Sequence, residues 1–174
     1  METIWYTLLP VTPVGPVWIA VSERGLGVIH MGAERTDFES QVHRRYGTVT
    51  LLADEQRTAE AAAQVQAYLQ GKRRTFTLPI DWQGMGAFQR RALQATFEIP
   101  YGETRSYGEI AAQLGSPKAA RAVGRAEATN PIPLVLPCHR VLGADGKLHG
   151  YGGGQGLPTK TWLLELEGAA VVKS

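Results

Sequence analysis

Short apolar runs alternate with turn residues in the first third of the chain and predict β-strands. Residues 3–9 (TIWYTLL) and 17–22 (VWIAVS) are rich in β-branched and aromatic side chains, and the turn sequence TPVGP separates them. Residues 25–31 (GLGVIHM) fit a third strand after a turn that ends at Gly25. This order predicts a small antiparallel sheet.

Two stretches with helical character follow these strands. Residues 37–47 end in basic residues and a glycine, as a helix C-terminus often does. The alanine-rich residues 54–71 have Asp54 as a candidate N-terminal cap and Gly71 as a stop. Helices that cover a sheet make a small α/β domain, which we place at residues 1–80.

The pattern becomes mostly helical after a connecting segment at residues 78–86. Residues 87–100 (AFQRRALQATFEIP) predict an amphipathic helix that Pro100 and Gly102 end, and Ser106 with Glu109 fits a capping box at the start of another helix. We expect residues 85–174 to form a second, mostly α-helical domain.

A basic helix is expected after the capped one, across a short turn (GSP). Lys118, Arg121 and Arg125 fall on one side of it. Two helices joined by a tight turn make a helix-turn-helix, whose basic side can neutralise phosphates while small residues approach a groove. A plain helical hairpin with a solvated basic face fits equally well. Glu127 is discordant, because an acid weakens phosphate contact unless it faces away from the DNA. The small residues are Ala119, Ala120, Ala122 and Gly124.

The charges are unevenly distributed between the two halves. Residues 1–84 carry eight Lys or Arg and nine Asp or Glu, whereas residues 85–174 carry ten and seven. The basic excess lies with the helix-turn-helix, although ordinary surface charge would look the same. No apolar run reaches the ~20 residues of a membrane-spanning helix, and the start of the chain lacks signal-peptide features. We therefore expect no membrane partner and a cytoplasmic location, or a nuclear one in a eukaryote.

The single cysteine, Cys138, lies in the sequence LPCHRV. A lone cysteine is most often buried and inert. Here His139 and Arg140 follow it, and basic neighbours lower a thiol pKa and favour the reactive thiolate. Adjacent residues of an extended chain point to opposite sides, so we expect a bridging water between the thiol and the imidazole unless the chain turns. The histidine needs an orienting acid, for which Glu165 and Glu167 are candidates.

Turn-forming residues surround this thiol. Asn130, Pro131 and Pro133 predict a constrained turn before it. The glycine run from Gly150 can approach a ligand with its bare backbone, although taken alone it is more simply a flexible turn. It lacks the spacing and the strand–helix context of a nucleotide-binding motif, so we expect no cofactor.

Taken in order, the segments IPYGETRSYGEIA, KAARAVG, NPIP, PCHRV, YGGG and LLELEG resemble the O6-alkylguanine-DNA alkyltransferases over roughly residues 86–168. The first half resembles that family only in length and strand pattern. The resemblance implies a monomeric repair protein with a winged-helix-like helix-turn-helix in its second domain. Such a protein binds double-stranded DNA, flips out an O6-alkylguanine and transfers the alkyl group irreversibly to its own cysteine, once. O4-alkylthymine is a second candidate substrate.

The resemblance also implies residue roles around the thiol. Cys138 is the alkyl acceptor, His139 takes the thiol proton through a water, and Glu167 holds the histidine, with Glu165 a weaker match. Asn130 holds the active-site turn. Tyr107 turns the target nucleotide outward and hydrogen-bonds guanine N3.

Further roles concern the base pocket and the DNA. Arg121 would fill the space left by the flipped nucleotide, and the Val141 carbonyl would accept from the guanine amino group. Gly152 stands where some relatives have serine. Pro133 would line the alkyl pocket, and the loop closing over the base would consist of Tyr151, Gly152 and Gly153.

Some relatives carry a zinc site in the first domain, but only His30 and His43 are available there, so we expect no metal. Three alternatives stay open. An alkyltransferase-like protein recognises the lesion without repair, but such relatives lack the cysteine. A helix-turn-helix regulator would leave the cysteine and histidine idle. A cysteine hydrolase would need an oxyanion hole that the sequence does not reveal.

Overall fold

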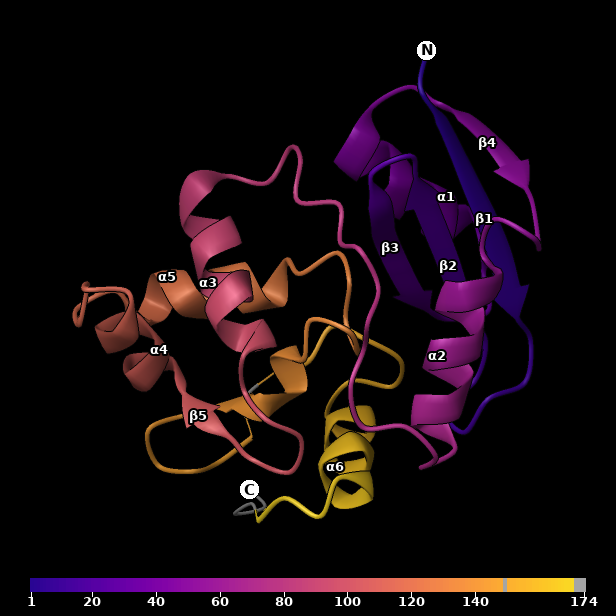
Figure 1. The fold of residues 1–174 in the computed structure, drawn as a ribbon. Coiled ribbons are helices and arrows are strands. Elements are labelled where there is room, and N and C mark those ends of the chain that lie inside the picture. Colours follow the sequence, from indigo (N-terminus) through magenta and orange to yellow (C-terminus); the bar gives the residue numbers. More distant parts are fainter. Residues whose placement is uncertain (149, 171–174) are drawn as a thin grey trace. The chain divides into compact units, whose positions relative to one another are not determined.

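The computed structural model describes residues 1–148 and 150–170, and Figure 1 shows their elements. The chain divides into two compact units, Met1–Gly84 and Met85–Ser174. No helix within the described ranges is long and apolar enough to cross a membrane.

A four-stranded sheet forms the centre of the first unit, with the strand order β3-β2-β1-β4 (Figure 1). Its first three strands are antiparallel neighbours, as the sequence predicts: β1 (Thr3–Leu9), β2 (Val17–Ser22) and β3 (Gly25–Met31). The prediction of an antiparallel sheet is incomplete, because β4 (Thr50–Ala53) pairs parallel with β1 and makes the sheet mixed. Three of the four β4 residues are exposed, so this strand has no apolar alternation for a sequence pattern to detect.

Helix α1 (Arg35–Tyr46) covers one face of the sheet with Phe38 and Val42, which pack on Ile4 and Trp18. The rings of Trp18 and Phe38 stack with their centroids 5.0 Å apart. These large apolar side chains are removed from water together, which is the main stabilising contribution in this unit.

Helix α2 (Ala59–Leu69) begins five residues later than its expected cap. The carboxylate of Asp54 accepts a hydrogen bond from the Arg57 amide at 2.9 Å and so closes the turn before the helix. Gly71 follows the C-terminus with a φ of 74°, the left-handed conformation expected of a helix stop.

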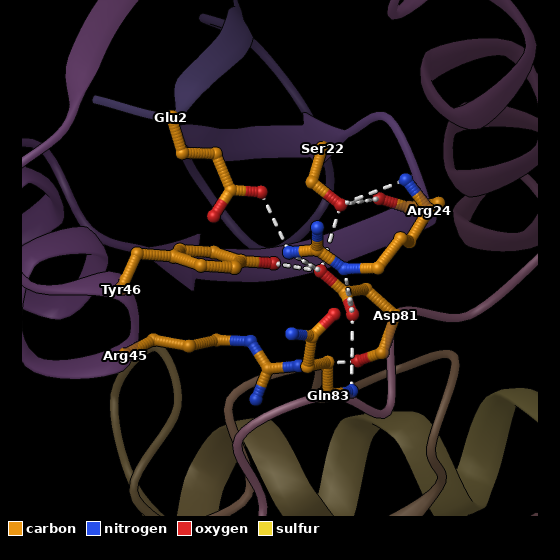
Figure 2. A network of polar contacts seen from close by, with 8 residues as sticks. Glu2, Ser22, Arg24, Arg45, Tyr46, Asp81 and Gln83 are labelled. Carbon is orange, nitrogen blue, oxygen red and sulfur yellow. Dashed lines mark hydrogen bonds and ion pairs between the residues drawn. The ribbon is translucent and has the colours of Figure 1, made fainter.

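The last segment of this unit is fixed to the sheet through Asp81 (Figure 2). The buried Asp81 carboxylate accepts hydrogen bonds from Ser22 (2.7 Å), Tyr46 (2.7 Å) and Arg24 (3.1 Å). Burial favours a higher pKa for this carboxyl, but these donors outweigh burial and hold its pKa below the usual value. Gly25 lies where any Cβ would meet the Pro79 carbonyl at 2.4 Å, so this close approach needs a glycine.

The second unit is mostly helical, as predicted. Its core joins the helices through Ala95, Ile110, Ala111, Val123 and Val141. Its elements are α3 (Ala87–Phe97), β5 (Arg105–Ser106), α4 (Tyr107–Gln113), α5 (Ala120–Ala128), the 3-10 helix η1 (Cys138–Arg140), β6 (Val141–Leu142) and α6 (Leu157–Leu166). The short strands β5 and β6 pair in parallel, which joins the start of α4 to the residues that follow the cysteine.

Helices α4 and α5 form the expected helix-turn-helix (Figure 1). The capping box at α4 is present: the Ser106 hydroxyl accepts from the Glu109 amide at 3.0 Å, and the Glu109 carboxylate accepts from the Ser106 amide at 2.9 Å. Lys118 and Ala119 lie in the turn, not on the second helix, because the Ala119 amide bonds the Ser116 carbonyl and closes that turn first.

Candidate active site

The turn before the cysteine is held by the side chain of Asn130. Its Oδ1 accepts from the Ile132 amide at 2.9 Å, and its Nδ2 donates to the Leu136 carbonyl at 2.8 Å. Leu134, between them, has a φ of 74°, a conformation that is uncommon for a branched residue. Both ends of the turn are therefore fixed by one amide group, which delivers Cys138 to a defined position.

Cys138 opens the 3-10 helix, so the chain does turn at the thiol. Cys138 is only 8% exposed, and burial raises the pKa of its thiol to about 12. The charge of Glu127 acts in the same direction, whereas a hydrogen bond from Asn130 and the charge of Lys160 oppose it. The basic neighbours were expected to lower this pKa, and that expectation is wrong, since neither of them contributes to the shift. At neutral pH the thiol keeps its proton.

The two basic neighbours do not lower the thiol pKa because both of them bind Glu167. The His139 Nε2 lies 2.8 Å from one carboxylate oxygen of Glu167. Arg140 donates to both oxygens, from Nε at 2.8 Å and from Nη2 at 2.9 Å, and a further nitrogen donates to the Ile99 carbonyl at 2.6 Å. All three charged or ionisable groups are buried. This two-point pairing leaves the arginine to neutralise Glu167, not to activate the thiol.

This cluster defines the protonation of the imidazole. Burial is the largest influence and lowers the pKa of His139, although Glu167 favours the charged form. The ring is therefore neutral at pH 7. Because the Glu167 carboxylate accepts at Nε2, that nitrogen carries the proton, and Nδ1 is the nitrogen able to accept one. Of the two candidate acids, Glu165 is exposed on α6 and Glu167 contacts the histidine.

Two tyrosines expected at the site lie close to the thiol. Tyr107 is the first residue of α4 and is half-buried, and burial with the nearby charges of Glu127 and Cys138 raises its pKa. Burial also raises the pKa of Tyr151, with further contributions from Cys138 and Glu167. Both hydroxyls therefore stay protonated and able to donate.

The other residues predicted for the base pocket have the following surroundings. Pro133 is buried within the turn that Asn130 holds. The Val141 carbonyl accepts a hydrogen bond from the buried Lys160 ammonium at 2.9 Å. Gly152 is exposed and Gly153 half-buried in the loop before α6. A Cβ added at Gly152 would meet only the Ala128 carbonyl, at 3.9 Å, so this position is open.

The basic residues expected to contact DNA lie on the surface of the second unit. Arg121, Arg125 and Lys118 are exposed. A Cβ added at Gly124 would meet no atom within 4 Å. The small residues between the basic ones are half-buried: Ala119, Ala120, Ala122 and Gly124. The exposed face of α5 is thus basic, and the side chains between its arginines are small.

Sequence reasoning missed the positions of Glu127 and Lys160. Glu127 lies four residues after Val123, and both are buried on the side of α5 that faces away from Arg121 and Arg125. This spacing was visible in the sequence, and it explains how an acid can lie on this helix without facing DNA. Lys160 gave no signal, because a lysine in an amphipathic helix is normally solvated.

Three comparisons place this geometry among known proteins. Residues 87–169 match the family model described as 6-O-methylguanine DNA methyltransferase, DNA binding domain, and residues 4–82 match its ribonuclease-like domain. A methylated-DNA–protein-cysteine methyltransferase from Mycobacterium leprae is 45% identical over 94% of this chain and 92% of its own. One from Methanosarcina acetivorans is 41% identical over 91% and 95%.

Solved structures agree with these matches. The crystal structure of Mycobacterium tuberculosis OGT in complex with DNA has a TM-score of 0.79 and 41% identity, covering 94% of this chain and 92% of that one. The family models account for both units, and the relatives are similar over nearly the whole chain. The chain therefore belongs to the 6-O-methylguanine DNA methyltransferase family.

Proposed function

We propose that this protein repairs alkylated DNA by transferring the alkyl group from O6 of guanine to its own Cys138. The observation that carries the proposal is the buried cluster in which the only thiol of the chain precedes His139, whose ring is held by Glu167. Its relatives named methylated-DNA–protein-cysteine methyltransferases support the same chemistry.

The exposed face of α5 binds the DNA. Arg121 and Arg125, with Lys118 in the turn, neutralise phosphates, and the small residues between them let the helix backbone approach the duplex. The thiol of a cysteine that is only 8% exposed cannot reach a base inside the stack, so the target nucleotide must leave the duplex and enter the protein. Arg121 fills the space it leaves.

The chemical step is an in-line displacement at the alkyl carbon. His139 takes the thiol proton at Nδ1, through a water, and the sulfur attacks the carbon as the bond from carbon to guanine O6 breaks. The electron pair of that bond stays with guanine, and Tyr107 donates a hydrogen bond to N3 of the departing base. The proton taken from the thiol balances the one that guanine finally gains. The products are intact guanine and a thioether at Cys138.

The raised pKa of the thiol fits this order of events. Because Cys138 is protonated in the free protein, it is a poor nucleophile toward solutes until the base and His139 lie in place. The pocket that receives the base consists of the Val141 carbonyl, Pro133 and the loop residues Tyr151, Gly152 and Gly153. Open space at Gly152 favours acceptance of alkyl groups larger than methyl.

The test is the intact mass of the protein after incubation with a duplex that contains O6-methylguanine. We expect a gain of one methylene, absent in Cys138→Ala. Unchanged mass with retained binding to the lesion would instead indicate an alkyltransferase-like or regulatory DNA-binding protein. Continuous release of product would indicate a hydrolase.

A further inference from the structure

Glu127 is a buried carboxyl within the active-site cluster to which the proposed mechanism gives no role. It is 7% exposed, on the inner side of α5. The Thr96 hydroxyl of α3 donates to its Oε1, while Oε2 is buried and has no hydrogen-bond partner among the described residues. A buried acid with one unsatisfied oxygen is costly unless it carries a proton.

The surroundings of this carboxyl are the groups that carry the chemistry. The Glu127 carbonyl accepts from the amide of Asn130, whose side chain bonds the thiol. Its charge acts on the Cys138 thiol and on Tyr107 of α4, and Lys160 of α6 acts on it in turn. His139 is neutral and Arg140 is paired with Glu167, so Lys160 is the cation that faces this acid in the described cluster. Burial lowers the pKa of Lys160 itself, while the charges of Cys138 and Glu127 favour its charged form.

We propose that Glu127 is a positioning residue for alkyl transfer, whose carboxyl must be protonated for Cys138 to lose its proton readily and whose ionised form slows the reaction. The inference rests on the proposed function for the transfer rate alone. The effect on the thiol itself is independent of which alkyl donor reacts.

The physical reason is repulsion between two anions inside one poorly solvated site. A second negative charge beside the thiol disfavours the thiolate, and Lys160 compensates for only one of the two. Burial raises the pKa of Glu127 to about 8, against the opposing contributions of Thr96 and Lys160. The carboxyl is therefore neutral at pH 7 and ionises in the alkaline range, where a thiol would otherwise become more reactive.

The experiment compares pH profiles of two reactions at Cys138, read by intact mass. Iodoacetamide reports the thiolate directly, because the chain has a single cysteine. A duplex with O6-methylguanine reports alkyl transfer. The proteins are the wild type, Glu127→Gln and the control Glu165→Gln, which removes an exposed acid from α6.

We expect Glu127→Gln to react at the wild-type rate near pH 6.5 and about tenfold faster near pH 9 in both reactions, since a like charge in a buried site is worth about one pKa unit or more. The control should follow the wild type throughout. Parallel profiles of wild type and Glu127→Gln would overturn the inference. A divergence with iodoacetamide but no methyl transfer by any variant would keep the role of Glu127 and overturn the proposed function.

Thr96→Val provides a second variant of nearly the same shape. The Thr96 hydrogen bond lowers the pKa of Glu127, so its loss should raise that pKa and move the alkaline inflection to higher pH. An inflection that stays in place in Thr96→Val would count against the carboxyl of Glu127 as its origin. This variant keeps the question decidable if Glu127→Gln folds poorly.

Discussion

At the scale of single residues, the three consecutive side chains of the PCHR motif have three separate functions. Cys138 is held protonated by burial, His139 is held neutral with Nδ1 as its basic nitrogen, and Arg140 neutralises the acid that orients the histidine. A pair of basic residues next to a thiol suggests electrostatic activation, but here both His139 and Arg140 bind Glu167. The structure therefore holds the thiol protonated, and in the proposed mechanism the thiolate forms only when His139 accepts the proton during the reaction.

Glu167→Gln tests this arrangement. The substitution keeps the size of the side chain but leaves Arg140 without its counter-charge and weakens the acceptor for His139 Nε2. We expect the single-turnover rate of methyl transfer to fall at least about a hundredfold, the usual worth of a positioned acid–base group. Glu165→Gln, on the exposed side of α6, should stay within about twofold of the wild type. Equal rates for both variants would contradict the assigned role.

At the scale of elements, the helix-turn-helix presents one face to solvent and the other to the thiol. Arg121 and Arg125 lie on the exposed side of α5, while Val123 and Glu127 lie on the buried side. The same nine-residue helix thus supplies the proposed DNA-binding surface and part of the environment of Cys138. In the first unit, a single buried carboxylate, that of Asp81, likewise joins the segment around it to Ser22 and Tyr46 (Figure 2).

Arg121→Ala tests the outer face of α5. If Arg121 replaces the flipped nucleotide in the stack, its loss should slow transfer from duplex DNA by about tenfold or more, since unstacking a base costs a few kcal/mol. Transfer from a free O6-alkylated guanine should change much less. Arg44→Ala, an exposed site on α1, is the charge-matched control. Equal losses on both substrates would exclude the intercalating role.

Asp81→Asn tests the anchoring of the segment at the end of the first unit. The carboxylate accepts from Ser22, Arg24 and Tyr46, so an amide there should lower the free energy of unfolding by about 2 kcal/mol at pH 7. Because folding lowers the pKa of Asp81, its contribution is present above the unfolded pKa of about 3.9 and is lost as pH falls through the folded value.

Hydrogen exchange of the β1–β3 amides at pH 7, with urea unfolding from pH 7 to pH 3, measures both effects. The difference in the free energy of unfolding between the wild type and Asp81→Asn should become smaller as the pH falls below about 4. A difference in unfolding free energy that stays constant with pH would show that the ionised carboxylate does not anchor the segment.

At the scale of the whole molecule, the chain has one thiol, so we expect each molecule to accept one alkyl group. A thioether is not reversed by thiol–disulfide exchange, because that exchange needs a disulfide sulfur to attack. In excess methylated duplex we expect one methyl group for each protein molecule, with no recovery after addition of a thiol reductant. The measurement is the amount of repaired guanine against the amount of protein, and a ratio that rises with time would contradict single turnover.

Sequence patterns predicted the local features of this molecule well. The first three strands are rich in β-branched and aromatic residues between turns, and the capping box is a serine and a glutamate three residues apart, so each can be recognised from a short stretch of sequence. Strand β4 leaves none, because most of its side chains are exposed and its pairing with β1 depends on residues distant in the chain. The start of α2 was placed too early for a different reason, because Asp54 caps a turn before the helix and not the helix itself.

The sequence by itself determined the presence of a single nucleophile, its histidine neighbour, the basic helix and the turn held by Asn130, since these depend on residue type and short spacing. The family resemblance already favoured Glu167 over Glu165 as the acid that binds the histidine, and the structure agrees. Only the tertiary structure decided that Glu127 and Lys160 lie near the thiol and that the thiol pKa is raised. Those outcomes depend on desolvation and on charges brought together from different helices, and neither quantity can be read along the chain.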